Sequence, residues 1–142
     1  VEGLCNYRFR PDSLDTFFST EYSVKSESNR IGYRFHGERL EFTDRGPVFG
    51  AGDNPSNVVD LGYPMGSIQV PDGAEPICLL RDAVTGGGYA TLGTVIARDL
   101  DLLAQAKVPD KVRFVRISID QAVELRHQQQ ARLAEAAAAL DG

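Results

Sequence analysis

Short apolar segments separated by turn residues fill the middle of the chain, and this pattern limits the fold more than any other feature. GSIQV (66–70) and PICLL (76–80) flank PDGAE, whose proline, aspartate and glycine are typical of turns. LGTVI (92–96) and DKVRFVRI (110–117) have the β-branched and aromatic content of strands. We therefore expect a mainly β domain with few helices.

The segment IGYRF (31–35) shows the alternation of a half-buried strand, with Ile31, Tyr33 and Phe35 on one face. Farther along, residues 43–64 are dense in glycine, proline, asparagine and aspartate. That composition predicts a long surface connection, a place where functional residues often lie.

Helices are expected before and after the strand region. RPDSLDTFFSTEY (10–22) places Pro11 in a first turn and forms an apolar face from three side chains, Leu14, Phe17 and Phe18. ARDLDLLAQA (97–106) predicts a second short helix. At the C-terminus, Ser118 and Gln121 have the spacing of a capping box.

The C-terminal segment predicts a helix that ends at Gly142, so we divide the chain into a β domain at 1–117 and a helix at 118–142. The apolar side of this helix is thin and consists of Ile119, Val123, Leu133 and Leu140. Such a helix rests on the domain or extends beyond it; a partner-helix role is the alternative.

Charge and hydropathy exclude several classes of partner. Acidic residues outnumber basic ones by 20 to 15, which argues against nucleic acid or an anionic membrane as a partner. No apolar stretch reaches the roughly 20 residues of a membrane-spanning helix. The opening residues VEGLCNYRFR lack the apolar core of a secretory signal, so we expect a cytoplasmic protein.

Cysteine and histidine usage predicts neither a disulfide nor a metal site. Cys5 and Cys78 are far apart in the sequence, and Cys78 lies in an apolar run that suggests a buried thiol. His36 and His127 are the two histidines, and their spacing is not that of metal ligands.

The stretch TGGGY contains three consecutive glycines, Gly86 to Gly88, and allows two interpretations. Backbone N–H groups of glycine loops bind anions, which would suggest a phosphate site. The stretch lacks the lysine and Ser/Thr of a Walker motif and leads into a predicted strand. A purely structural turn is therefore an equal alternative.

Four polar side chains near the predicted strand ends are candidates for a site. Asp82 follows a buried strand, where a carboxylate must be paired or face a cleft. Arg30 and Arg34 offer planar donors for carboxylate, carbamate or phosphate groups, and Gln69 places an amide on an apolar strand. Each has a structural alternative: a turn cap for Asp82, solvated strand positions for the arginines, and a backbone contact for Gln69.

Two long stretches carry a family resemblance. YSVKSESNRIGYRFHGERLEF (22–42) and the segment from GSIQV to RIS (66–118) resemble the biotin-dependent carboxyltransferase-like family. That family includes the C subunit of 5-oxoprolinase, the KipA protein and the protein labelled allophanate hydrolase subunit 2, and it is similar to the carboxyltransferase part of urea carboxylase. The resemblance runs from about Phe9 to Ser118.

The resemblance implies a fold, an assembly and two alternative functions. The fold is a cyclophilin-like β-barrel with short helices and a C-terminal helix, paired with a barrel protein like KipI or the B subunit of 5-oxoprolinase. The assembly uses ATP to open 5-oxoproline or passes a carboxyl group from carboxybiotin to urea or a similar small amide or lactam. The alternative is a regulatory protein that antagonises a KipI-like kinase inhibitor.

The resemblance covers only the C-terminal half of the family's full-length unit. It therefore implies that the chain works with the missing N-terminal half and is not active alone. The chain has a single methionine, Met65, and so lacks the Met-Lys-Met of a biotin carrier. ATP or carboxybiotin would accordingly reach the site through the complex, with no cofactor bound covalently to this chain.

Residue by residue, the glycine stretch follows the family pattern DxQTTGGYP only in part. The matching positions are Asp82, Thr85, Gly87, Gly88 and Tyr89, and farther upstream Arg30, Gly32, Tyr33 and Arg34. The departures are Asn29 for aspartate, Val84 for glutamine, Gly86 for threonine and Ala90 for proline. The lost polar side chains indicate a changed substrate or a reduced catalytic role.

The matching positions imply the composition of a site without metal. Catalysis is expected from Asp82 and Arg30. The residues expected to bind substrate are Arg34, Gln69, Thr85, Gly87, Gly88 and Tyr89. In this hypothesis the glycines turn the chain at the barrel rim and present N–H groups to an oxyanion.

Overall fold

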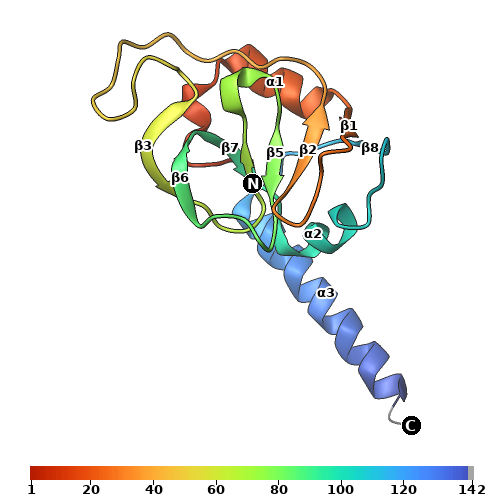
Figure 1. Ribbon diagram of the computed structural model, residues 1–142. Helices are drawn as coiled ribbons and strands as arrows, with labels where there is room; N and C mark the ends of the chain where they lie inside the picture. The colour runs from red at the N-terminus through yellow and green to blue at the C-terminus, as the bar shows by residue number, and fades with distance from the viewer. Residues whose placement is uncertain (141–142) are drawn as a thin grey trace.

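The computed structural model describes residues 1–140 and has a sheet of six strands beside a two-stranded ribbon (Figure 1). The order in the large sheet is β7-β4-β5-β2-β1-β8, and the ribbon pairs β3 with β6. The strands are β1 (Tyr22–Val24), β2 (Gly32–His36), β3 (Asn57–Gly62), β4 (Ser67–Gln69), β5 (Ile77–Leu79), β6 (Gly86–Tyr89), β7 (Thr91–Thr94) and β8 (Lys111–Val112). All pairings are antiparallel.

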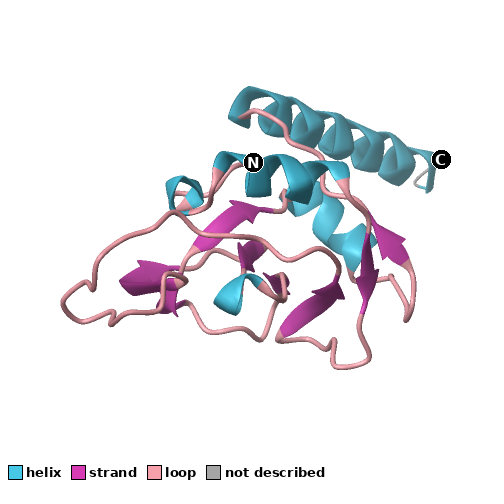
Figure 2. Cartoon of the chain, turned by 90° about the horizontal axis from the view of Figure 1, so that it is seen from above, coloured by secondary structure: helices cyan, strands magenta, loops and turns pink. Residues whose placement is uncertain are grey.

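Three α-helices and two short 3-10 turns make up the rest of the regular structure in residues 1–140 (Figure 2). The helices are α1 (Pro11–Ser19), α2 (Ala97–Leu103) and α3 (Ile119–Leu140), and the 3-10 turns are η1 (Asn6–Arg8) and η2 (Pro71–Gly73). The expected mainly β fold with short helices and a C-terminal helix is confirmed. Within residues 1–140 the strands do not close into a barrel, since β7 and β8 remain the two edges of an open sheet.

Aromatic packing between α1 and the sheet forms the centre of the core. Phe17, Tyr22 and Phe35 are fully buried, and Phe114 contacts all three, with ring centroids 4.8, 6.0 and 5.3 Å away respectively. The apolar face predicted for residues 10–22 thus packs as expected, and Pro11 occupies the first turn of α1. Burial of such a cluster is the main stabilising term available to a small domain.

The turn predicted between residues 70 and 76 is present, and it depends on Gly73. The backbone there has a φ of +73°, and a Cβ on this residue would overlap the Leu40 carbonyl oxygen. Only glycine fits such a position. The turn brings β4 and β5 together, with Ile68 opposite Cys78 and Gln69 opposite Ile77.

Two expectations about strands are wrong in extent. The predicted surface connection at 43–64 contains β3. Asn57–Gly62 forms this strand because it pairs with the glycine stretch, not because its own sequence has the alternation of a strand. The predicted strand 110–117 pairs with β1 only at Lys111–Val112. Beyond β8 the chain leaves the sheet, and the Phe114 side chain packs against the aromatic core.

A third expectation, the placement of Ile31 on the buried face of a strand, is also wrong. Ile31 is exposed and lies before β2, where its carbonyl accepts a hydrogen bond from the Leu80 amide at 2.9 Å. The pairing of β2 with β5 begins at Gly32, so Ile31 lies before the strand and its side chain is not packed in the sheet. Phe35 is buried and Tyr33 half-buried, as the alternation predicts.

Helix α3 begins with the predicted capping box. The Gln121 amide donates to Ser118 Oγ at 3.1 Å, and the Ser118 amide donates to Gln121 Oε1 at 2.8 Å. Its first turns lie near α2, and its distal part projects away from the body (Figure 1). None of its described residues is buried. The predicted end at Gly142 lies outside the described residues.

Candidate functional site

The glycine stretch is a strand, not the turn at a rim that the sequence suggested. Strand β6 pairs with β3, with Leu61 opposite Gly87 and Gly62 opposite Gly86. The Tyr63 amide donates to the Thr85 carbonyl at 2.8 Å, which continues the same ladder. In an antiparallel ladder alternate residues turn their backbone groups away from the partner strand. Gly86 is one of these residues, and it is exposed.

Tyr63 explains why one of these positions must be glycine. A Cβ on Gly87 would lie 2.9 Å from Tyr63 Cε2, closer than packed carbon atoms approach each other. The Tyr63 hydroxyl donates to the Tyr89 carbonyl at 2.8 Å and accepts from the Tyr89 amide at 2.7 Å. A Cβ on Gly86 would meet nothing closer than 3.7 Å, so packing does not require glycine there.

Beside the glycine strand lies a hollow of about 360 Å³. Its lining residues come from β3, β6 and the loop between β2 and β3, and they are Gly50, Ala51, Asn57, Val58, Val59, Gly88 and Tyr89. A register shift in the ribbon between Asn57 and Leu61 lies next to it. Two of the predicted substrate-binding residues, Gly88 and Tyr89, therefore share a space large enough for a small molecule.

The predicted catalytic residues lie together in the structure. Arg30 Nε is 2.7 Å from Asp82 Oδ2, and Arg30 Nη2 is 3.1 Å from Asp82 Oδ1, a bidentate pair. The pair is open to solvent, with exposed side-chain fractions of 78% for Arg30 and 45% for Asp82. The hydrogen bond with Arg30 lowers the pKa of the Asp82 carboxyl, which therefore stays ionised at neutral pH.

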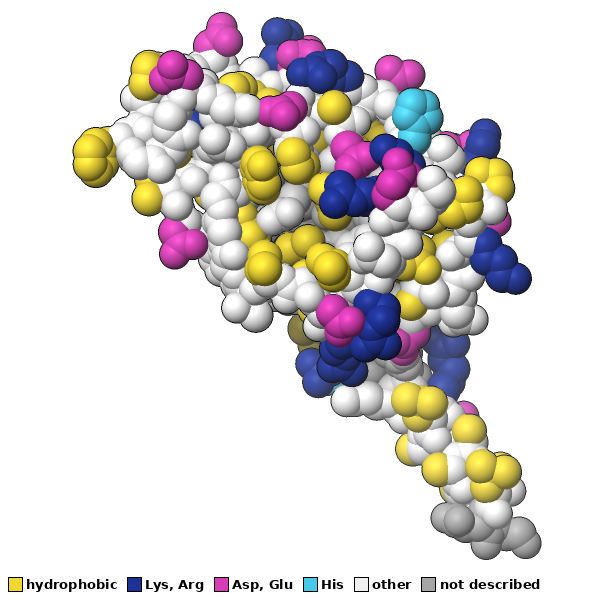
Figure 3. Space-filling view, viewed as in Figure 1, with side chains coloured by type: hydrophobic (Ala, Val, Ile, Leu, Met, Phe, Trp, Pro, Cys, Tyr) yellow, Lys and Arg dark blue, Asp and Glu magenta, His cyan; other side chains and the backbone are white. Residues whose placement is uncertain are grey.

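Arg34 lies on β2, just after Arg30 in the sequence, and belongs to a different cluster of charged side chains. Its Nη1 is 2.6 Å from Glu75 Oε2, and Lys25 Nζ bonds the other oxygen of the same carboxylate. Burial of Glu75 opposes its ionisation, but the hydrogen bonds from Lys25 and Arg34 outweigh this effect and lower the pKa of the carboxyl. On the face shown in Figure 3, basic and acidic side chains lie beside one another in such clusters.

Gln69 is buried on β4, opposite Ile77 and Thr91, and does not reach the surface. Its side chain lies near the Tyr63 hydroxyl. Sequence reasoning missed Tyr63 itself. The only signal for it was an aromatic residue isolated in the glycine- and proline-containing run LGYPMG.

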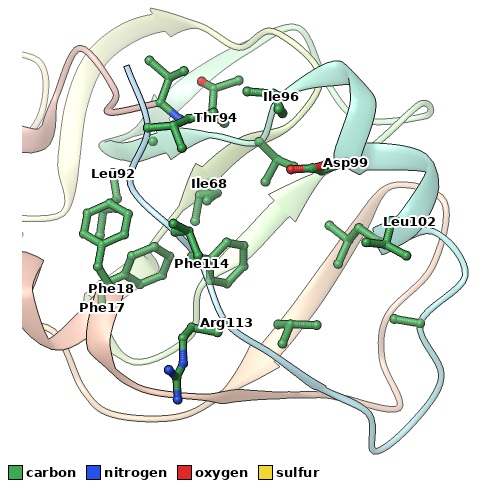
Figure 4. A pocket seen from close by; sticks show the side chains of 18 of the residues that line it. Phe17, Phe18, Ile68, Leu92, Thr94, Ile96, Asp99, Leu102, Arg113 and Phe114 are labelled. Carbon is green, nitrogen blue, oxygen red and sulfur yellow. Dashed lines mark hydrogen bonds between the residues drawn. The ribbon is translucent and has the colours of Figure 1, made fainter. Parts of the chain in front are cut away.

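A larger cavity of about 670 Å³ is lined by other residues and contains none of the predicted site residues. Apolar side chains from α1, β7, α2 and the segment after β8 dominate its wall, as Figure 4 shows for Phe17, Leu92 and Phe114. Leu125 of α3 also lines it, so the C-terminal helix covers part of the core.

Three further findings bear on the classes of site. Among residues 1–140, no three histidine, cysteine or acidic side chains are grouped closely enough to hold a metal ion. In the same part of the chain no helix is long and apolar enough to cross a membrane. Cys5 and Cys78 are both free and buried.

Comparison with known structures defines the class first. The fold matches the Kluyveromyces lactis urea carboxylase with a TM-score of 0.81 and 28% identity over 89% of this chain and 11% of that one. A structure of the K. lactis urea amidolyase gives the same score over 8% of its own chain. The domain is therefore built like part of these two enzymes.

Sequence comparison then shows the family. The model of the carboxyltransferase domain, subdomain A and B, matches residues 1–116. The chain belongs to this carboxyltransferase family. It is 34% identical over 125 residues to the C subunit of the Escherichia coli 5-oxoprolinase and 33% identical over 120 residues to that of Haemophilus influenzae. These alignments cover 87% and 84% of the chain but only 37% and 36% of the relatives. The chain thus spans little more than a third of their length, less than the expected half.

Proposed function

We propose that the chain handles the substrate in an ATP-dependent assembly of the 5-oxoprolinase or urea carboxylase type. The family match over residues 1–116 carries the proposal. The hollow of about 360 Å³ beside the glycine strand supports it, because this volume lies at the small end of ligand sites. A small amide, a lactam such as 5-oxoproline, or urea is the class of substrate that would suit it.

In this proposal, residues on strand β6 and near it have different roles in catalysis and substrate binding. Arg30 and Asp82 are the catalytic pair, and the exposed amide of Gly86 is a fixed donor for a developing oxyanion. These three residues do not line the hollow, which Gly88 and Tyr89 border on the same strand as Gly86. Thr85, Gly88 and Tyr89 contact the substrate. Gly87 and Gln69 do not contact it and lie beside Tyr63. Arg34 can join only by sharing its guanidinium with Glu75, because one of its nitrogens already binds that carboxylate.

The residues present do not fit ATP or a biotin attachment site. In the glycine stretch the N–H groups belong to a strand, whereas nucleotide phosphates are held by loops that open a helix. With one methionine, Met65, the chain cannot form a Met-Lys-Met carrier sequence. We assign ATP use and any carboxybiotin to other parts of the assembly, among them a protein like KipI or the B subunit of 5-oxoprolinase and the remaining part of the family's full-length unit.

The regulatory alternative gains no support from the relatives. Their names are those of the C subunit of 5-oxoprolinase, urea amidolyase and putative urea carboxylase.

The proposal is tested by turnover of the assembly purified with its co-expressed polypeptides. Supplied with ATP, it should either convert 5-oxoproline to glutamate or, with bicarbonate present, carboxylate urea. Arg30→Ala should lower kcat/KM by about 100-fold, as expected for loss of a group that stabilises transition-state charge. If the wild-type assembly consumes neither substrate, the proposed function is wrong.

Arg10→Ala is the matched control. Arg10 forms a bidentate, exposed pair with Asp12, with distances of 3.1 and 2.9 Å, and it lies at the start of α1 away from β6. Its removal tests for loss of an exposed arginine in general and should leave turnover unchanged. Equal kcat/KM for Arg30→Ala and wild type would remove Arg30 from the site.

A further inference from the structure

We propose that Tyr63 is a positioning residue for this site, one that holds the glycine strand in the course that shapes the hollow beside Gly88 and Tyr89. The inference rests on the proposed function, because it takes β6 as the strand that faces the substrate. It gives a role to a residue that no sequence motif indicated.

The first support is the way the hydroxyl binds both backbone groups of one residue. The Ala90 amide donates to the Ser56 carbonyl at 2.8 Å, so the adjacent Tyr89 turns its own N–H and C=O away from β3. Those two groups would otherwise lie at the free edge of the ribbon. The Tyr63 hydroxyl satisfies both of them, at 2.7 and 2.8 Å.

The second support is steric. Tyr63 is only 5% exposed, and its ring lies across the backbone of Gly87, where a Cβ would be 2.9 Å from Cε2. The ring and the hydroxyl therefore fix two alternate residues of β6 from one side. A strand of glycines has little packing of its own, since it has no side chains, and needs such an external constraint.

The protonation state suits this role. Burial raises the pKa of the Tyr63 hydroxyl, and the hydrogen bonds with the Tyr89 backbone and Gln69 only partly oppose the shift. The hydroxyl thus remains a donor throughout the neutral range. Gln69, expected from the sequence to bind substrate, is buried near this hydroxyl.

Tyr63→Phe tests the proposal, because it keeps the ring on Gly87 and removes only the hydroxyl. Hydrogen exchange of the Tyr89 amide, followed by NMR on the chain, should become about 10-fold faster or more, since a hydrogen bond lost there is worth about that factor. The Cys78 amide in β5 should keep its protection. In the assembly, kcat/KM for 5-oxoproline or urea should fall about 10-fold.

Tyr33→Phe is the matched control. The Tyr33 hydroxyl also contacts backbone carbonyls, those of Ala104 and Ala106 at 3.1 and 3.2 Å, but at the end of α2. Its removal should change neither Tyr89 exchange nor turnover. Should Tyr63→Phe fail to fold, Gly87→Ala provides the second variant, since its Cβ displaces the same ring. Gly62→Ala on β3 is its control, because a Cβ on Gly62 would meet nothing within 4 Å.

The outcomes separate the inference from the proposed function. An unchanged rate of hydrogen exchange at the Tyr89 amide in Tyr63→Phe would overturn the inference that the Tyr63 hydroxyl holds Tyr89, whatever the turnover of the assembly. Faster exchange with unchanged turnover would overturn its positioning role. A uniform rise in exchange across β5 and β6 would indicate general destabilisation and would also overturn it. A wild-type assembly without turnover would refute the proposed function, and with it the role of Tyr63 in positioning substrate. The hydrogen-exchange result would still decide whether the Tyr63 hydroxyl holds the Tyr89 backbone.

Discussion

Phe114 should be a principal stabilising residue of the domain, although it lies outside every strand. Its ring stacks on Phe17 at 4.8 Å and meets Phe35 edge to face at 5.3 Å. Truncating a buried phenylalanine to alanine costs about 3–5 kcal/mol of unfolding free energy, and Phe114 is only partly buried. We therefore expect Phe114→Ala to lower the free energy of unfolding by about 3 kcal/mol.

The measurement is urea denaturation followed by far-ultraviolet circular dichroism, because the chain has no tryptophan to report by fluorescence. Val115→Ala is the control: Val115 is the next residue, is 71% exposed and should cost less than about 0.5 kcal/mol. A loss below about 1 kcal/mol for Phe114→Ala, or an equal loss for Val115→Ala, would refute docking of this segment. If Phe114→Ala does not fold, Phe114→Leu should cost about 1–2 kcal/mol.

Two further predictions concern ionisable groups. Glu75 has a lowered pKa in the folded state, so its stabilising contribution is present above its ordinary value of 4.5 and is lost as the pH falls through the lowered value. Urea denaturation should show Glu75→Gln less stable than wild type at pH 7, and the difference should shrink as the pH falls below 4.5; a difference that does not depend on pH would contradict the ion pairing. Burial raises the pKa of the Cys78 thiol to about 12, so a disulfide reagent at pH 8 should react with it only after denaturation. Immediate reaction of the native chain at Cys78 would show that the thiol is accessible.

Local patterns in the sequence were sufficient for much of the fold. Pro11, the apolar face of α1 and the capping box of Ser118 and Gln121 act within a few residues, and all are present as predicted. The turn at Gly73 also follows from local chemistry, because only glycine adopts that backbone conformation freely. The pairing of β4 with β5 is a direct consequence of that turn.

The candidate site could be predicted only in part. The resemblance singled out Arg30 and Asp82, 52 positions apart, and the structure places them in one bidentate pair. It also grouped Arg34 with them, but Arg34 is held by Glu75, which neither the turn motif nor the resemblance identified as its partner. Ion-pair partners distant in the sequence leave no local signal, because contact depends on how the strands align.

The sequence by itself determined a mainly β domain, its family and the presence of an unusual glycine stretch. Only the tertiary structure decided what the stretch does. Glycines carry no side-chain pattern, so nothing local distinguishes a turn from a strand, and pairing with β3 settles the matter through backbone hydrogen bonds. In the same way, the need for glycine at position 87 exists only because the Tyr63 ring, 24 residues earlier, packs against it.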